Sequence, residues 1–437
     1  MKSIRIAASL LLLWLAMPPA ANSQSVTGQL SGRVTDPTGA VLVGAPVQLT
    51  HDLSKQVRNF TTDSNGAFVF VGLVPGAYSL HIAQPGFKSY DQKAITIATV
   101  ERVALNDIKL EVGEVSTSVE VLARAVNVAT DSSDRTVNIT LAQIGDIATR
   151  GRNPLNLIIA LPGVQTLAGN DFRGWSGGGV PAINGGQMGQ VILSLDGVAS
   201  QDSGNLNPGY ISPSVDAVGE VRLLVSNYTA EYGGRTGGQL TFTVKNGTNK
   251  FHGGAYYYWR HEMFNANEWF NNKLGNPKPK YRYQNPGGTI GGPLIIPGTR
   301  FNQSRTKLFF FFSYDRLRNK SQINNTYTMP SALERQGDFS QTVTTTGVQV
   351  PIYDPTTQTP FPSNRIPASM FSRAGQAMLN LFPLPDPLGL ALDPTGNRRY
   401  NYRAILPQSR PNEGKILRVD YNLGSRAVFY TRLLQDY

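Results

Sequence analysis

After its first 23 residues the chain has no apolar run long enough to cross a bilayer as a helix, and short stretches of alternating apolar and polar residues recur instead. A spanning helix needs about 20 consecutive apolar residues. Alternation with a period of two is typical of β-strands that bury one face. Gly and Pro, with 44 and 28 residues, supply the turns between such strands. The sequence therefore predicts a mainly β protein, which could occupy a membrane only as a barrel.

The first 23 residues have the organisation of a secretory signal peptide. Lys2 and Arg5 give a basic start, Ile6–Met17 is apolar, and Ala21–Ser23 is a small-residue cleavage site. Two prolines at 18 and 19 end the apolar run too early for a membrane helix. We therefore expect cleavage between Ser23 and Gln24 and export of the mature chain.

Composition narrows the function classes. The chain has no Cys, so it uses neither disulfides nor thiol chemistry, and its net charge is +11. Lys and Arg are scattered without a basic tract, so we expect no nucleic-acid partner and instead contact with anionic lipid or lipopolysaccharide. His51, His81, His252 and His261 lack metal-ligand spacing. We expect no metal site and no cofactor.

Residues 24–113 are predicted to form a β-sandwich, because short alternating strands are separated by turn signals every eight to twelve residues. Three motifs occur in order: Gly32–Asp36, Thr62–Phe68 and Leu73–Tyr78. They match the patterns G-x-V-x-D, T-D-x-x-G-x-F and L-x-P-G-x-Y of the carboxypeptidase regulatory-like domain, which this segment resembles over nearly its whole length. The resemblance implies a non-catalytic module and no peptidase activity.

Residues 114–237 are predicted to form a mixed α/β domain with long Gly-rich loops. Asn153 and Pro154 read as the N-cap and first position of a helix that extends to Leu161. The apolar runs Val191–Leu195 and Val221–Val225 read as strands, and Asp196 reads as a turn residue before Gly197.

From Gly238 onward the pattern is that of β-hairpins. Leu240, Phe242 and Val244 alternate with polar residues ahead of an Asn-Gly turn signal. Strand Lys415–Tyr421 places three apolar side chains on one face, with Arg418 and Asp420 on the other. Both a transmembrane barrel and a soluble sandwich give this alternation.

Many short motifs in the second and third regions resemble the Oar-like branch of TonB-dependent receptors, in the family's order. They are Gly151–Asn153, Leu161–Val164, Leu195–Val198, Glu231–Gly234, Gly237–Gly238, Lys245–Asn249, Phe251–Gly253, Gly291–Pro293, Phe309–Tyr314, Arg335–Ser340, Tyr353–Pro355 and Asn364–Pro367. The resemblance covers nearly all of the mature chain. It implies a periplasmic module, then a plug at 114–237, then a 22-stranded outer-membrane barrel beginning in 238–437, and it implies a TonB-type energy-coupling partner.

The strand count conflicts with a closed barrel. Only about six to eight strands fit between Gly238 and Tyr437, and a barrel of eight strands has a lumen just filled by its own side chains. It could not enclose a plug. We therefore expect an incomplete barrel and an N-terminal fragment of a longer protein.

The resemblance implies that a short extended segment ahead of the plug pairs with TonB by strand addition. The candidate consists of Val119, Glu120, Val121, Leu122 and Ala123. The alternative is that the same residues form the last strand of the sandwich or a linker.

A Gly-rich run follows the predicted helix and includes Gly177, Gly178, Gly179, Gly185 and Gly186. Around Ser176 it fits G-x-S-x-G, but no strand precedes the motif and no helix follows, so a hydrolase elbow is not expected. In a plug, such a loop would line the extracellular or lumenal surface. We therefore predict no catalytic residues and no enzyme activity.

Two functions remain open from the sequence. The first is energy-coupled transport of an unidentified large solute across the outer membrane, with the N-terminal domain in the periplasm. The second is a surface adhesin that binds carbohydrate or protein through the sandwich or the long Pro-rich segment Asn319–Pro411.

Overall fold

The computed structural model describes residues 27–105, 107–113, 118–122, 133–147, 152–165, 182–187, 190–200, 213–232, 234–273, 277–344, 346–386, 401–409, 411–424 and 427–436. The expected cleavage site at Ser23 and Gln24 lies outside this part of the chain, so it stays a prediction. None of the helices in the described ranges is long and apolar enough to cross a membrane.

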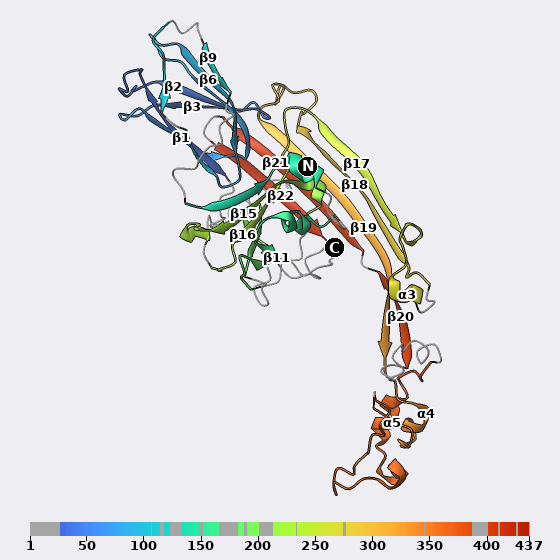
Figure 1. The fold of residues 1–437 in the computed structure, drawn as a ribbon. Coiled ribbons are helices and arrows are strands. Elements are labelled where there is room, and N and C mark those ends of the chain that lie inside the picture. The colour runs from blue at the N-terminus through green and yellow to red at the C-terminus, as the bar shows by residue number, and fades with distance from the viewer. Residues whose placement is uncertain are drawn as a thin grey trace, which may run out of the picture. The chain divides into compact units, whose positions relative to one another are not determined.

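The N-terminal domain consists of two β-sheets (Figure 1). In the first, β1 (Gly28–Thr35) pairs with β4 (Ala67–Leu73), β7 (Arg102–Ala104) and β8 (Ile108–Lys109). The second has the order β3 (Val57–Thr61), β2 (Pro46–His51), β5 (Gly76–Ile82), β6 (Ser89–Ile97) and β9 (Ser118–Leu122). Apolar side chains from both sheets, among them Leu30, Phe68, Leu49 and Leu80, form one buried core. The predicted sandwich is therefore present.

Strand β9 joins this domain from beyond the boundary expected at residue 113. It pairs in parallel with β6, from Ser89 opposite Ser118 to Lys93 opposite Leu122. The segment expected to precede the plug is therefore the edge strand of a sandwich sheet, which is the structural alternative left open by the sequence.

The middle domain (residues 133–244) is built on a five-stranded sheet of order β10 (Arg135–Ile139), β15 (Val218–Ser226), β16 (Gln239–Val244), β13 (Ile192–Leu195) and β14 (Val198–Ala199). A separate two-stranded sheet pairs β11 (Val164–Gln165) with β12 (Ala182–Ile183). The helical elements are short: α2 (Leu141–Asp146), η2 (Pro154–Ala160), η3 (Val215–Ala217) and η4 (Ala230–Tyr232). This is the expected mixed α/β domain.

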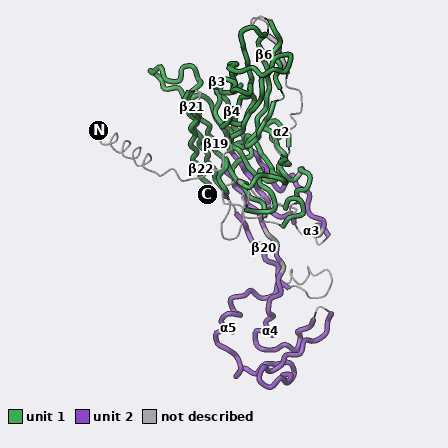
Figure 2. Tube along the Cα trace, turned by 90° about the vertical axis from the view of Figure 1, so that its left-hand side faces the viewer, with its two compact units in different colours: residues 1–256, 287–315, 412–437 green, residues 257–286, 316–411 purple. Residues whose placement is uncertain are grey.

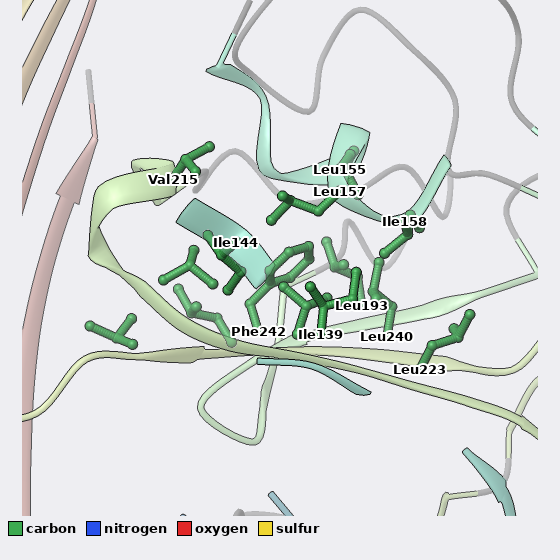
Figure 3. Packing of buried hydrophobic residues seen from close by; sticks show 14 of the residues in the cluster. Ile139, Ile144, Leu155, Leu157, Ile158, Leu193, Val215, Leu223, Leu240 and Phe242 are labelled. Carbon is green, nitrogen blue, oxygen red and sulfur yellow. The ribbon is translucent and has the colours of Figure 1, made fainter. Parts of the chain in front are cut away.

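Helices α2 and η2 contribute apolar side chains to one core with the sheet. Ile144 of α2 and Leu157 of η2 lie with Phe242 and Leu193 from the strands (Figure 3). Asn153 caps η2 by accepting a hydrogen bond from the Leu155 amide (3.0 Å), with Pro154 at the first position, as predicted. The helix is a 3₁₀ helix.

Strand β16 differs from the expectation that the barrel begins at Gly238. It is a central strand of the middle sheet, antiparallel to β15 and parallel to β13, and all six of its residues are buried. Its polar face resembles a solvent-facing one in sequence, but Thr241 bonds Ser194 and Thr243 bonds Thr99 (2.8 Å each). The alternation therefore reflects two buried faces, and the barrel sheet begins with the next strand.

The barrel sheet has the order β17 (His252–His261), β18 (Tyr281–Pro293), β19 (Leu308–Tyr327), β21 (Asn412–Leu423) and β22 (Ala427–Asp436), and β20 (Tyr402–Ser409) also pairs with β19. Within the described ranges, β17 pairs only with β18 and β22 only with β21, so these two strands form the edges of an open sheet. Shorter helices lie between the strands: η5 (Glu262–Phe264), α3 (Trp269–Lys273), α4 (Ala332–Arg335), η6 (Pro362–Asn364), η7 (Ala368–Met370) and α5 (Arg373–Leu379).

The chain divides into two compact units (Figure 2). Unit 1 holds the sandwich, the middle domain and residues 287–315 and 412–437, whereas unit 2 holds 257–286 and 316–411. Unit 2 includes a small subdomain, residues 328–386, in which Gly337 and Asn364 are the only buried residues among those described. The side chain of Asn364 accepts from the Ile352 amide and donates to the Phe339 and Val350 carbonyls (2.7, 2.7 and 2.8 Å). Asn364 therefore connects three backbone positions of this subdomain, near residues 339, 350 and 352.

Strand β21 buries polar side chains and exposes apolar ones, which is the reverse of the usual arrangement in a soluble protein. Arg418, Asp420 and Asn422 are buried, whereas Leu417 and Leu423 on the opposite face are exposed. The two faces predicted from the sequence are present. Apolar residues outside and polar residues inside are the pattern of a membrane barrel wall.

Candidate functional site

A two-residue hairpin turn between β13 and β14 places a carboxylate deep in unit 1. Leu195 pairs with Val198, and the turn residues Asp196 and Gly197 both have positive φ, 45° and 80°. Asp-Gly is a favoured pair for a turn of this kind, as the sequence indicated. The Asp196 side chain is 1% exposed, and its Oδ1 accepts a hydrogen bond from the Val244 amide (2.8 Å). This bond ties the turn to the end of β16.

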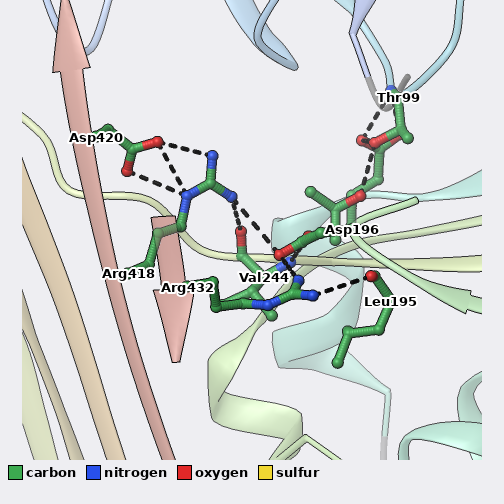
Figure 4. Close-up of polar contacts among 9 residues, drawn as sticks. Thr99, Leu195, Asp196, Val244, Arg418, Asp420 and Arg432 are labelled. Atoms are coloured by element: carbon green, nitrogen blue, oxygen red, sulfur yellow. Dashed lines mark hydrogen bonds and ion pairs between the residues drawn. The ribbon is translucent and has the colours of Figure 1, made fainter. Parts of the chain in front are cut away.

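Two arginines from the barrel sheet converge on this carboxylate (Figure 4). Arg418 of β21 and Arg432 of β22 are register partners in the antiparallel pair. Arg432 makes an ion pair with Asp196 Oδ2 and donates to the Leu195 carbonyl (3.2 Å). Arg418 Nη1 lies 3.9 Å from the same Oδ2 and donates to the Val244 carbonyl (3.2 Å). The β21–β22 hairpin therefore contacts the Asp196 side chain and the Leu195 and Val244 carbonyls of the middle domain.

Asp420 completes this charge cluster (Asp196, Arg418, Asp420, Arg432). Arg418 Nε and Nη2 donate to Asp420 at 3.0 and 2.8 Å, and its guanidinium lies 4.9 Å from the Tyr430 ring centroid. The Arg418 and Asp420 side chains are at most 8% exposed. Two guanidinium groups therefore face two carboxylates away from water, where an ion left without its partner costs about 3–5 kcal/mol.

The charge cluster can hold the middle domain against the barrel sheet without preventing release. Only Asp196 comes from the middle domain, whereas Arg418, Asp420 and Arg432 come from the barrel sheet. If Asp196 moves away, the Arg418–Asp420 pair persists, so part of the charge remains compensated. Chemically this is a reversible ionic contact, with no arrangement of nucleophile and base.

A second polar contact, between Thr99, Glu220 and Thr243, links the sandwich to the middle domain. The Glu220 carboxylate accepts from the Thr99 amide (3.0 Å) and hydroxyl (2.6 Å), and that hydroxyl also bonds the Thr243 hydroxyl (2.8 Å). Burial raises the pKa of Glu220, and the Thr99 hydrogen bonds oppose this effect. Burial also lowers the pKa of the neighbouring Arg222 guanidinium. We call this contact the Thr99–Glu220 clasp.

The residues singled out in the sequence do not gather at either contact. Val119, Glu120, Val121 and Leu122 lie in β9, and Ala123 lies outside the described residues. Gly185 and Gly186 form a turn after β12, with Gly185 at a φ of 74°. Gly177, Gly178, Gly179 and Ser176 lie outside the described residues. In the part that the structure describes, no group of three His, Cys, Asp or Glu residues is placed to hold a metal ion.

Sequence reasoning assigned Asp196 to a turn and missed its role in the charge cluster. The turn assignment was correct, but the Asp-Gly pair explained the residue fully, so nothing pointed to a buried partner. One signal was present: Arg418 and Asp420 alternate with apolar residues on a strand. In a barrel wall this places charges on the inner face, where they need partners.

Two family models match the chain. A carboxypeptidase regulatory-like domain matches residues 29–111, and an outer membrane beta barrel domain matches residues 243–437. The second match begins at the end of β16 and contains every strand of the barrel sheet, which agrees with the reversed polarity of β21.

Among curated proteins, the chain is 25% identical over 272 residues to the TonB-dependent transporter Oar of Myxococcus xanthus. The alignment covers 59% of this chain and 23% of that protein, so the chain spans about a quarter of the relative's length. Among solved structures it is similar to the outer membrane transporter YddB of Escherichia coli (12% identity, 68% of this chain and 32% of that one, TM-score 0.39). It is also similar to the ferric enterobactin receptor of Pseudomonas aeruginosa (12%, 70% and 33%, TM-score 0.36).

The two family models place a carboxypeptidase regulatory-like domain ahead of an outer membrane β-barrel domain, as the sequence resemblance implied. The chain is an outer-membrane protein that joins a carboxypeptidase regulatory-like domain to an outer membrane β-barrel domain, and it is a homologue of the TonB-dependent transporter Oar.

Proposed function

We propose that the chain takes part in energy-coupled passage of a large solute across the outer membrane, with the middle domain acting as the plug. The observation that carries this proposal is the position of Asp196, which leaves the middle sheet on a turn and is buried between two arginines of adjacent barrel strands. A plug must stay seated until energy is supplied. A buried ionic contact that can be broken without leaving every charge unpaired suits this requirement.

Energy would come from a TonB-type protein that pairs with Val119–Ala123 in the periplasm, where the sandwich would also lie. Homology to a TonB-dependent transporter supports this partner. The exposed apolar face of β21 would contact outer-membrane lipid and lipopolysaccharide. The solute is unidentified, and we assign no catalytic role to any residue.

Planar-bilayer conductance of the native protein isolated from outer membranes tests the plug. Asp196→Asn removes the charge but keeps an oxygen acceptor for the Val244 amide, so only the ionic contact is weakened. We expect more frequent or larger conductance steps than in the wild type under mild urea. Asp420→Asn is the matched control, since it removes a carboxylate that the middle domain does not carry. Equal conductance of Asp196→Asn and the wild type would contradict a plug held by the charge cluster.

The adhesin alternative is separated by Val121→Pro, which removes a backbone donor needed for strand addition. The readouts are surface display and entry of a glycopeptide antibiotic too large for ordinary porins, measured in cells carrying Asp196→Asn with and without the proline. Transport predicts that entry depends on an intact segment while display is unchanged. Retained adhesion of cells to carbohydrate or protein surfaces, with entry indifferent to both substitutions, would favour the adhesin.

A further inference from the structure

A cavity of about 820 Å³ lies within unit 1, bordered by the sandwich, the middle domain and the β21–β22 hairpin. Its wall includes Arg418 of the charge cluster and Glu220 and Thr243 of the Thr99–Glu220 clasp, so the cavity adjoins both polar contacts. Mostly apolar cavities of about 300–1,000 Å³ with a few polar groups are typical of small-molecule sites. We call this space the junction cavity.

Apolar side chains from all three parts line the junction cavity and remain accessible to solvent. They are Leu53 and Val71 of the sandwich, Leu141 of α2 and Phe429 of β22, with exposed fractions between 50% and 61%. Single exposed apolar residues are ordinary in a folded protein. Four that border one cavity form a shared apolar surface, and such a surface marks a binding site. An apolar chain in the cavity would therefore bury surface against all three parts at once.

Two cations on the same wall have no carboxylate partner among the described residues. Lys245 directly follows β16 and is partly buried, and its acidic neighbour Asp216 is already paired with Arg152. Arg58 of β3 donates to two backbone carbonyls of β4, at 2.6 and 3.1 Å, which carry no net charge. Burial lowers the pKa of both Lys245 and Arg58. An anion beside such a cation would stabilise its charged form.

The two carboxylates on the wall limit the charge that a ligand can carry. Glu101 accepts a hydrogen bond from the Ala98 amide (2.6 Å), and Glu220 accepts from Thr99 in the clasp. Both carboxylates interact with the Arg222 guanidinium, which offsets part of their charge. They would still repel a dianion more strongly than a monoanion. A carboxylate head therefore fits the cavity better than a phosphate monoester.

We propose that the junction cavity binds an amphipathic carboxylate, with its head beside Lys245 and its alkyl chain against Val71, Leu141 and Phe429. Arg58 would add a second positive charge to the wall. The bound molecule would contact the sandwich, the middle domain and the hairpin together. Because it would bind only when these parts are assembled, it would stabilise their contact.

Photolabelling of the native protein in outer-membrane vesicles tests the site. The probe is decanoate that carries a diazirine in its alkyl chain, and the labelled residues are located by peptide mass spectrometry. We expect labels in residues 71–75 and 138–141, which belong to the sandwich and the middle domain, so partition of the probe into lipid does not account for them. Decanoate should displace the probe at least about tenfold more effectively than decanol, which has the same chain without the charge. Absence of labels from these two segments, or equal displacement by decanol, would overturn the proposal.

Lys245→Met tests the position of the head, because it removes the charge and keeps a side chain of similar length. Loss of a partly buried, charge-assisted contact should weaken probe binding by at least about tenfold. Lys109→Met, at an exposed lysine of β8 outside the cavity, is the matched control and should bind the probe as the wild type does. Equal binding by the two variants would contradict a carboxylate held by Lys245.

Val71→Trp tests the position of the alkyl chain by filling the cavity from an exposed site on β4. Val69→Trp is the matched control, since Val69 is an exposed residue on the same face of β4 but does not line the cavity. We expect Val71→Trp to weaken probe binding by at least about tenfold and Val69→Trp to leave it unchanged. Equal binding by these two variants would place the chain elsewhere and overturn the proposal. Neither TonB nor solute passage enters these measurements, so their outcome is independent of the proposed function.

Discussion

Asp196 combines two roles that depend on one backbone conformation. Its positive φ closes the β13–β14 hairpin, and the same geometry directs its carboxylate to the Val244 amide and to Arg432. Non-Gly residues other than Asn and Asp reach this conformation only with strain. Asn at position 196 would therefore keep the turn conformation but remove the charge, so this substitution separates the two roles.

Asp196→Ala should destabilise the middle domain by about 1–2 kcal/mol more than Asp196→Asn, because Ala is strained at positive φ. It also leaves the Val244 amide without its acceptor. Urea-dependent hydrogen exchange of the β13 and β14 amides measures the difference. Gly197→Ala, at a φ of 80°, strains the turn while leaving the charges in place. Equal effects of Ala and Asn at position 196 would show that the turn conformation contributes nothing.

Glu220 should make stability depend on pH in a defined direction. Burial raises its folded-state pKa above the ordinary value of 4.5. Between these two values the folded protein holds a proton that the unfolded chain has released, so this contribution is complete below pH 4.5 and is lost as pH rises through the folded pKa. The stability of the wild type minus that of Glu220→Gln should therefore decrease across this window, as measured by urea titrations at several pH values.

At the scale of elements, similar alternating patterns serve different environments. β16 and β21 both alternate apolar and polar residues, yet β16 buries both faces in the middle sheet whereas β21 buries its polar face and exposes its apolar one. In the unit 2 subdomain, the buried side chain of Asn364 makes three hydrogen bonds to backbone groups. In each case, the burial of a polar side chain depends on which neighbouring residues pack against it.

Asn364→Ala should destabilise the 328–386 subdomain by about 3 kcal/mol, because three hydrogen bonds are lost at roughly 1 kcal/mol each. Protease sensitivity of this segment in the intact protein measures the effect. Gln358→Ala is the control, since Gln358 also has positive φ but its amide makes a single bond to Pro355. Loss of resistance in both variants alike would point to backbone strain as the cause.

At the scale of the whole molecule, the polarity of the barrel sheet decides where the protein resides. Leu417 is exposed on β21, opposite the buried Arg418. Leu417→Lys should destabilise the protein in lipid by about 2–4 kcal/mol if this position lies at the bilayer centre, and by less near the interfaces. Folding into phospholipid vesicles across a urea series measures this cost. Leu381→Lys, at an exposed site in the unit 2 subdomain, is the matched control, and equal tolerance of both substitutions would contradict a lipid-facing wall.

The sequence by itself determined the local secondary-structure elements and the resemblance of each region to a known family. Turn residues and alternation located the sandwich strands, the capped helix after Asn153 and the Asp-Gly turn at 196, because these depend on neighbours in the chain. Motif order supplied the resemblance to TonB-dependent receptors, which the family models and the relative support. The expected signal peptide and the role of Val119–Ala123 remain predictions.

Only the tertiary structure decided which strands share a sheet and which charges meet. Residues 118–122 pair with β6, β16 belongs to the middle sheet, and Asp196 lies beside Arg432, which is 236 positions away in the chain. A period of two shows that a strand has two unlike faces, but not what covers each face. Pairing between distant strands is fixed by burial and backbone hydrogen bonding across the folded chain, and no local pattern encodes it.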